Sequence, residues 1–364
     1  MVTWEPGTGK IFEELVAVRA RFLCAQRLVQ PYLYDNDDGD KLLVAPNDRG
    51  ELNDMPRNHQ GIAVIGDQRN DTYLFIAHLH VALLKLHNHL VDRVRAAGAP
   101  ATQVFEMAQR LTRWHYQWVV VNEYLPLHVG ADVVAQILND EPGLLPLDRD
   151  PFVPVEFAAA IFRFGHAQVR AFYDVNDAVR HVALFPDLVG QRPLVAAQVP
   201  DWRHFFAFPD QPAPQASKRI DALYAHGLMH LPLQLTGVLA QPEHAALAYR
   251  DLQRGAALGL PSGEAVAEAL GVAPLRREEL RLPAELCHGG TPLAYYVQRE
   301  AMVQHGGDYL GAVGGRVLAE VLLGLLLGDP TAYLYAEPNW QPTLPAAAGT
   351  FRMTDLLTAA EVAR

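Results

Sequence analysis

The stretch that decides the fold is YLFIAHLHVALLKLHNHLVDRV, residues 73–94. Its leucines and one valine recur at steps of three and four residues. These are Leu79, Leu83, Leu86, Leu90 and Val94. Charged residues such as Lys85 and Asp92 lie between them, so one face is apolar and the other polar. This pattern is typical of an amphipathic helix of about six turns.

The same helical period recurs along the chain, and strand alternation is nearly absent. It predicts a second helix over 104–124 that ends before Pro126, because proline rarely continues a helix. A third helix is predicted after Pro154. Its apolar stripe would consist of Val155, Ala159, Phe162, His166, Val169 and Tyr173. Further helices are predicted at 218–238, 263–271, 291–305 and 313–327. The predicted fold class is therefore mainly α.

Segments rich in Pro, Gly and Asp separate these helices and are predicted to be loops. They cover 31–68, 140–154, 184–216 and 328–350. None resembles a flexible Gly/Ser linker, and no shift in composition divides the chain. We therefore expect a single helical domain with long ordered loops over 30–364, preceded by an N-terminal helical segment at 1–29.

Composition and charge narrow the class of protein. Half of the 364 residues are hydrophobic, which is enough for a substantial core. The balance of 30 Lys plus Arg against 41 Asp plus Glu gives a net charge of −11, which argues against a nucleic-acid partner. Cys24 and Cys287 lie outside any Cys/His cluster, so they predict neither a disulfide framework nor a thiolate zinc site. With no signal sequence and no apolar run long enough to span a bilayer, we expect a cytoplasmic protein without a membrane partner.

Two strings that suggest metal sites do not have the required spacing. The histidines at 78, 80, 87 and 89 form two HxH pairs, but residues i and i+2 of a helix point about 200° apart and cannot share one ion. The acidic run 35–40 has neither the Gly nor the Glu that a calcium-binding EF-hand loop needs, so we interpret it as a solvated turn.

His166 is the most informative position. On the predicted third helix, Arg163 precedes it by three residues and Arg170 follows it by four, so the side chains would project near one another. One interpretation is an ordinary core histidine. The other is a haem ligand, for which an apolar wall orients the imidazole while neighbouring arginines neutralise the propionates.

Arg69 is the second informative position. It follows Gly66 and Asp67 and precedes the first long helix. Alone, this string indicates a turn in which Asp71 or Thr72 caps the helix.

The ordered set of short strings resembles bacterial members of the animal-type haem peroxidase superfamily, the peroxidase–cyclooxygenase group, over about residues 30–357. The strings that carry the resemblance are PYLYD at 31–35, KLLV at 41–44, IGDQRND at 65–71, LH at 79–80, LHN at 86–88, WHYQW at 114–118, EYLP at 123–126, FRFGH at 162–166, LGLPSG at 258–263, TPL at 291–293, GAVG at 311–314 and WQPTLP at 340–345.

The resemblance implies roles for four residues. His166 would ligate the haem iron, Arg69 would polarise bound peroxide on the distal side, and Arg163 would lie near a haem propionate. Asp251 occupies the position where the family has an Asn that accepts a hydrogen bond from the ligating imidazole. A carboxylate there would make the ligand more basic, which favours oxidation chemistry. The alternative for Asp251 is a surface carboxylate paired with Arg250 or Arg254.

Other positions depart from the family pattern. The distal histidine is missing upstream of Arg69, where the chain has only His59, which we predict as a substitute base. The family's calcium loop is missing as well, so no calcium is expected. Thr72 replaces the Glu that bonds haem covalently in some members, and we therefore predict non-covalent haem b. Arg163 stands where cyclooxygenases have a radical-carrying Tyr.

The resemblance predicts an enzyme, a haem-dependent, peroxidase-like oxidoreductase that oxidises a small organic substrate with peroxide or oxygen. Without the distal histidine, turnover should be weak, because general acid–base help is worth typically 10²–10⁴-fold. Two alternatives stay open. A partner chain could supply the missing distal segment, or the chain could be a non-catalytic haem-binding or scaffold protein.

Overall fold

The structure, a computed structural model, describes residues 31–140, 143–144, 151–237, 241–283 and 289–362. The predicted helical segment at 1–29 and both cysteines lie outside the described residues. The chain divides into two compact units, and each takes segments from distant parts of the sequence. The first comprises Met1–Glu123, Phe172–Ala216 and Asp329–Arg364, and the second comprises Tyr124–Ala171 and Ser217–Gly328. A domain boundary at residue 30 stays a prediction.

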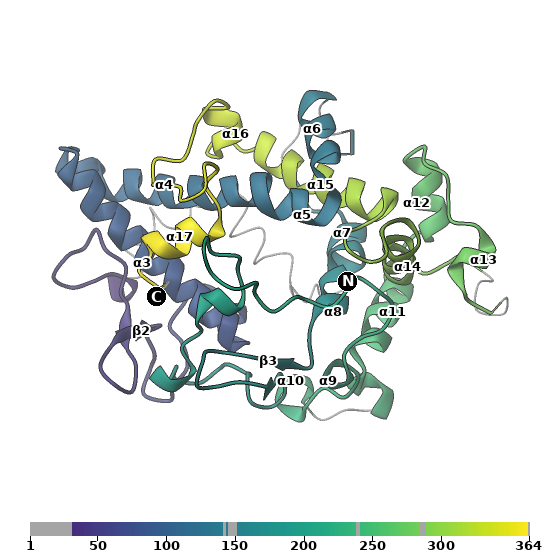
Figure 1. The fold of residues 1–364 in the computed structure, drawn as a ribbon, viewed down its shortest axis with the longest axis horizontal. Helices are drawn as coiled ribbons and strands as arrows, with labels where there is room; N and C mark the ends of the chain where they lie inside the picture. The colour runs from purple at the N-terminus through teal and green to yellow at the C-terminus, as the bar shows by residue number, and fades with distance from the viewer. Residues whose placement is uncertain (1–30, 141–142, 145–150, 238–240, 284–288, 363–364) are drawn as a thin grey trace. The chain divides into compact units, whose positions relative to one another are not determined.

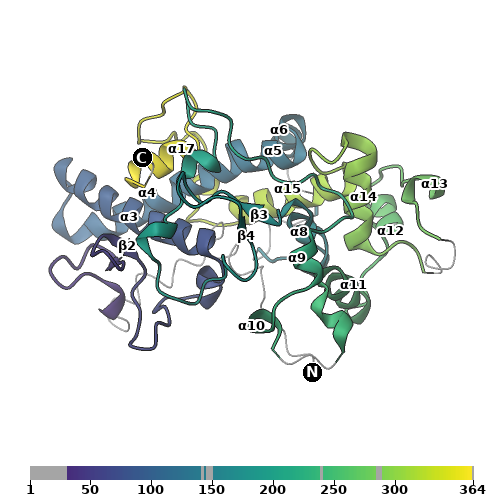
Figure 2. The same cartoon turned by 60° about the horizontal axis from the view of Figure 1, so that its bottom comes forward.

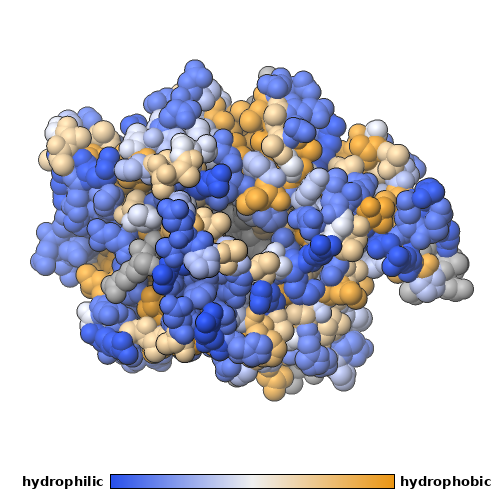
Figure 3. Space-filling view, in the orientation of Figure 1, coloured by the Kyte–Doolittle hydropathy of each residue, from blue (hydrophilic) through white to orange (hydrophobic). Residues whose placement is uncertain are grey.

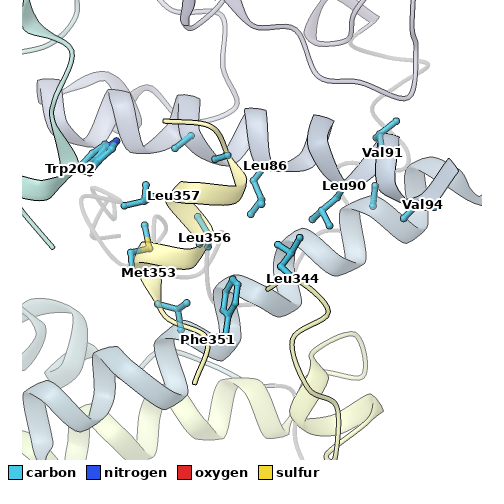
Figure 4. Packing of buried hydrophobic residues seen from close by; sticks show 14 of the residues in the cluster. Leu86, Leu90, Val91, Val94, Trp202, Leu344, Phe351, Met353, Leu356 and Leu357 are labelled. Atoms are coloured by element: carbon cyan, nitrogen blue, oxygen red, sulfur yellow. The ribbon is translucent and has the colours of Figure 1, made fainter. Parts of the chain in front are cut away.

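The first unit is built on two long helices, α3 (Leu74–Ala96) and α4 (Val104–Val119), which pack against each other and against the C-terminal helix α17 (Met353–Ala359) (Figure 1). The apolar face predicted from residues 73–94 forms the core here. Leu86 and Leu90 are buried in one cluster with Leu344 and with Leu356 and Leu357 of α17 (Figure 4). The 3.6-residue period therefore correctly predicted which face of α3 is buried.

A buried histidine joins α4 to a long loop of the first unit. His115 Nδ1 lies 2.7 Å from the Leu111 carbonyl oxygen, and its Nε2 accepts hydrogen bonds from the amides of Thr343 and Leu344 at 3.0 and 3.2 Å. Because Nε2 accepts, Nδ1 carries the proton. Burial, above all other causes, lowers the pKa of His115 to about 4. Its neutral form therefore holds the loop at 343–344.

The rest of the first unit is short elements and loops. The helices are η1 (Pro31–Leu33), η2 (Gln68–Asp71), η3 (Ala101–Gln103), η6 (Ala196–Gln198), η7 (Trp202–His204) and α16 (Tyr333–Ala336). The strands pair antiparallel, β1 (Ala45–Pro46) with β2 (Leu52–Asp54) and β3 (Phe172–Tyr173) with β4 (Val182–Ala183), the second pair being visible in Figure 2. The predicted loops at 31–68, 184–216 and 328–350 are confirmed in the main, with short helices and the β1–β2 pair inside them. Most of the predicted loop at 140–154 lies outside the described residues.

The second unit is centred on α14 (Leu293–His305), which packs against α11 (Leu247–Ala257), α12 (Gly263–Ala269), α13 (Arg277–Leu280) and α15 (Ala312–Leu327). Buried Glu300 of α14 accepts hydrogen bonds from the amides of Val313 and Gly314. These amides lie in the first turn of α15, where backbone N–H groups have no partner within the helix. Gly263 is required for the close approach of α12, because a Cβ there would lie 1.9 Å from Cγ of Tyr296.

The unit also contains eight other helices, most of them short, among the described residues. They are α5 (Leu125–Val129), α6 (Ala131–Asp140), α7 (Val155–Ala159), η5 (Ile161–Phe164), α8 (Gly165–Gln168), α9 (His226–Met229), α10 (Leu233–Thr236) and η8 (Pro242–Ala245). The mainly α fold class is confirmed, as are the predicted helices at 73–94, 263–271, 291–305 and 313–327.

One predicted helix end and one predicted helix are wrong. Pro126 does not end the second helix, because α4 widens into a π-helical turn, Val120–Tyr124, and α5 begins with Pro126 in its first turn. There a proline removes no intrahelical hydrogen bond. The helix predicted at 218–238 is two single-turn helices, α9 and α10, and Gly237 ends the latter with a φ of +65°.

The visible surface is mostly hydrophilic, with scattered apolar residues (Figure 3). Among the described residues, α3 alone has the length and apolar content of a membrane span. Half of its most apolar 18-residue stretch is buried within the structure.

Candidate functional site

His166 lies in a chain segment that differs from the predicted third helix. The segment is three short helices, α7, η5 and α8, with a break at Ala160, where φ is −132° and ψ is −65°. Val169 is extended, so Arg170 does not follow His166 on a helix. The single apolar stripe was therefore a wrong prediction. Ala159, Ala160 and Ile161 are buried in succession, which a single helical stripe does not allow, so tertiary packing overrides the helical period here.

The predicted contact between His166 and Asp251 is present. Nδ1 of His166 lies 2.7 Å from Oδ2 of Asp251, which α11 holds almost fully buried. An ionised carboxylate only accepts hydrogen bonds, so Nδ1 donates and Nε2 of the ring has a free lone pair. Among the described residues, Nε2 has no hydrogen-bond partner. The alternative is wrong in placing Asp251 at the surface, although the pairing with Arg254 that it expected is present.

Asp251 also accepts from two further donors. The Tyr224 hydroxyl lies 3.0 Å from Oδ2, and Arg254 Nη1 lies 3.2 Å from Oδ1. Gln298 Nε2 in turn donates to the Tyr224 oxygen at 2.8 Å. Burial, together with the Asp251 charge, raises the pKa of Tyr224 well above its usual value. We call these residues, with His166, the Asp251 cluster.

Arg163 precedes the cluster on η5. Its Nε donates to the Ala158 carbonyl at 2.9 Å, and no described carboxylate pairs with its guanidinium. Burial and, next, the positive charge of Arg254 lower the pKa of Arg163 to about 10, while Asp251 partly offsets them. Such a cation gains electrostatic stability when an anionic ligand binds beside it.

Arg69 belongs to the first unit, on η2. Asp67 caps this short helix by accepting from the Arg69 amide at 3.0 Å, and the same carboxylate accepts from Nε of the guanidinium at 2.8 Å. The predicted cap by Asp71 or Thr72 is wrong. The residue before α3 is Tyr73, which makes no side-chain cap, and Asp71 is buried in an ion pair.

That ion pair centres on Arg57, which sequence reasoning missed. Its Nη1 and Nη2 bond the two oxygens of Asp71 at 2.7 and 2.9 Å, and Nε bonds Asp54 at 3.0 Å. All three side chains are at most 7% exposed. The pairing ties β2 to η2 and thereby fixes the segment that carries Arg69.

The histidine predicted as a substitute base is exposed. His59 lies at the tip of the turn between Asn58 and Gly61. His80, on α3, is partly buried, and its Nδ1 lies 3.3 Å from Nδ2 of Asn70, the residue after Arg69. Asn70 donates in this contact, so Nδ1 of His80 accepts. Burial lowers the pKa of His80 to about 4, so its ring is neutral at pH 7.

The strings considered as metal sites lie on a helix and in a turn. The four histidines at 78–89 lie on α3, and the one group of described residues with the geometry of a metal site is Asp177, Asp201 and His204. The acidic run 35–40 is a turn, in which Asp38 and Asp40 pair with Arg95 near the end of α3.

The structure therefore brings His166, Asp251 and Arg163 together in the second unit. Arg69 and His59 belong to the first unit. A place for them opposite His166 stays a prediction.

Comparison with known proteins decides the family. The family model described as animal haem peroxidase matches residues 27–280, more than half of the chain. The chain belongs to the animal haem peroxidase family.

The relatives of this chain match it only over segments. It is 32% identical to heme peroxidase 2 of Caenorhabditis elegans over 117 residues, which are 29% of this chain and 16% of that protein. It is 31% identical to the thyroid peroxidase of Sus scrofa over 141 residues, which are 38% of this chain and 15% of that protein.

Two solved structures share the fold. Peroxidase A from Dictyostelium discoideum has a TM-score of 0.58 at 18% identity, with 83% of this chain and 61% of that one covered. The fatty acid alpha-dioxygenase of Arabidopsis thaliana has a TM-score of 0.55 at 11% identity, with 91% and 57% covered. This chain thus spans only part of the length of the proteins that it matches.

Proposed function

We propose that the chain is a haem-dependent oxidoreductase of the peroxidase type, with His166 as the ligand of the iron. The observation that carries the proposal is the 2.7 Å hydrogen bond from Nδ1 of His166 to Asp251, with Nε2 unpartnered among the described residues. A metal-ligating histidine requires this arrangement, because the partner of one nitrogen fixes the tautomer that presents the other. The residues present therefore fit a haem. When bound, haem supplies an iron that changes oxidation state.

Arg163 is proposed to hold a haem propionate. It is largely buried, it lies three residues before His166, and among the described residues it has no carboxylate partner. A propionate would compensate its positive charge, which now lies near that of Arg254. Arg254 is already bonded to Asp251, so Arg163 is the better candidate.

Arg69 is proposed to stabilise bound peroxide as its charge develops. A guanidinium does so electrostatically, but because it stays protonated in proteins it cannot serve as the base. Proton transfer therefore needs another group. We keep His59 as one candidate. His80 is a second, because its Nδ1 is held by Asn70 next to Arg69, while Nε2 has no partner among the described residues.

The proposed cofactor is haem b held without a covalent bond. Thr72 cannot form the ester that a Glu forms at this position in some members, because its side chain has a hydroxyl and no carboxylate. The proposed reaction is oxidation of a small organic substrate by peroxide, or by oxygen.

The test is a titration of the purified chain with hemin, followed by the Soret band. We expect saturation at one haem per chain, and loss or a large shift of the band in His166→Ala. His230→Ala is the matched control, since it removes an exposed histidine of the same unit. Equal spectra of His166→Ala and the unaltered chain would contradict His166 as ligand. Absence of haem uptake would favour the scaffold or two-chain alternatives.

A further inference from the structure

A continuous chain of hydrogen bonds links α14 to the histidine at the site. Gln298 donates to the Tyr224 oxygen at 2.8 Å, Tyr224 donates to Asp251 Oδ2 at 3.0 Å, and this same oxygen accepts from His166 at 2.7 Å. The residues come from α14, the loop before α9, α11 and α8. They therefore join elements that are far apart in the sequence.

The direction of each hydrogen bond follows from the chemistry of its groups. The Gln298 amide nitrogen is only a donor, so it occupies an acceptor lone pair of the Tyr224 oxygen. The hydroxyl proton is then free to point at Asp251, which as a carboxylate only accepts. Asp251 receives Tyr224 and His166 on one oxygen and Arg254 on the other. Three donors on a buried carboxylate leave it little freedom to rotate.

The position of the carboxylate matters for His166. The ring makes its one hydrogen bond with a described residue through Nδ1, and its side chain is 24% exposed, so packing alone does not fix the ring. The Tyr224 ring lies against it edge-on, with centroids 6.0 Å apart and an interplanar angle of 77°. The hydroxyl thus fixes the acceptor, and the ring limits rotation of the imidazole.

We propose that Tyr224 is a positioning residue for His166, and that its hydroxyl, set by Gln298, holds Asp251 where it fixes the tautomer that presents Nε2. The proposal rests on the proposed function only in its consequence for haem, since the tautomer is a property of the protein without haem. A structural role alone would be served by the ring, so Tyr224→Phe separates the two.

The experiment is nitrogen NMR of the full chain labelled with ¹⁵N-histidine, without haem, at a pH where the ring signals report a neutral imidazole. His166→Ala assigns the signal. We expect the unaltered chain to show His166 with its proton on Nδ1. In Tyr224→Phe the two tautomers should exchange, with the Nδ1 and Nε2 shifts moving toward each other. Gln298→Leu should move them the same way but less.

Tyr295→Phe is the matched control. Its hydroxyl, in the same unit, donates to the Leu280 carbonyl at 2.8 Å, away from the chain of hydrogen bonds that joins Gln298, Tyr224, Asp251 and His166. It should leave the His166 signals in place. With haem added, Tyr224→Phe should weaken binding about tenfold, the lower end of the range for partners of metal-ligating histidines.

Unchanged His166 signals in Tyr224→Phe would overturn the proposal, whatever the haem titration shows. If Tyr224→Phe does not fold, as judged by circular dichroism, Gln298→Leu decides in its place, and unchanged signals there would overturn the proposal. If the unaltered chain binds no haem but the tautomer shift appears, the positioning role stands and the proposed function fails.

Discussion

Arg57→Met should destabilise the protein strongly. The side chain bonds Asp54, Asp71 and the Gly61 carbonyl, and both carboxylates are at most 5% exposed. Methionine fills a similar volume but leaves two buried carboxylates without their cation. Breaking a buried ion pair by removing one partner costs about 3–5 kcal/mol. With an m-value of about 3 kcal/mol/M, the urea midpoint should fall by about 1 to 1.7 M.

The assay is urea unfolding of the full chain, followed by circular dichroism and tryptophan fluorescence. Arg49→Met is the matched control, since it removes an exposed arginine from the same unit and should move the midpoint little. A loss below about 1 kcal/mol in Arg57→Met would show that the pairing does not stabilise this segment. The reasoning about how η2 is fixed would then be refuted.

Three further outcomes are expected. His115→Gln should reduce the loss of folding stability that occurs at acid pH. The pKa of His115 is lowered to about 4 in the folded chain, so below about pH 6.5 the unfolded chain binds more protons than the folded chain. Acid therefore destabilises the unaltered protein through this residue. In urea titrations, the free energy of unfolding should fall by about 2 kcal/mol less between pH 7 and 5 in the variant than in the unaltered chain. Guaiacol-type peroxidation should be slow, and slower still in Arg69→Ala. High activity that is unaffected by Arg69→Ala, His59→Ala or His80→Ala would show that the distal pocket has been assigned to the wrong residues. Acid–butanone should extract the haem, because Thr72 cannot form an ester with it. Haem retained by the protein would indicate a covalent bond.

The helices that sequence could predict are those with long, regular apolar stripes. α3 and α15 are of this kind, because one face or nearly the whole surface is buried along many turns. α11 was missed although it carries Asp251, since Asp251 is its only buried residue. A helix whose buried position is polar shows no repeated apolar positions by which the sequence could predict it. The break at Ala160 was missed for the opposite reason, because tertiary packing there overrides a good helical pattern.

At the site, residue identities were more predictable than their surroundings. The His166–Asp251 hydrogen bond followed from the family resemblance. Tyr224 and Gln298 lie far from both in the sequence, and no local pattern marks a hydroxyl or an amide that donates across the fold. Likewise, the pairing of Arg57 with Asp71 could not be inferred, since Asp71 has the ordinary appearance of a helix cap before α3.

The central claim, that His166 ligates the haem iron, is tested most directly by rescue with free imidazole. His166→Gly removes the ring and leaves Asp251 with Tyr224 and Arg254. Adding imidazole to the hemin-loaded variant should restore the Soret band of the unaltered chain, because the free ring takes the place of the missing one and donates to Asp251. A His166→Gly spectrum that already equals that of the unaltered chain, or one that imidazole changes equally in both proteins, would contradict the claim.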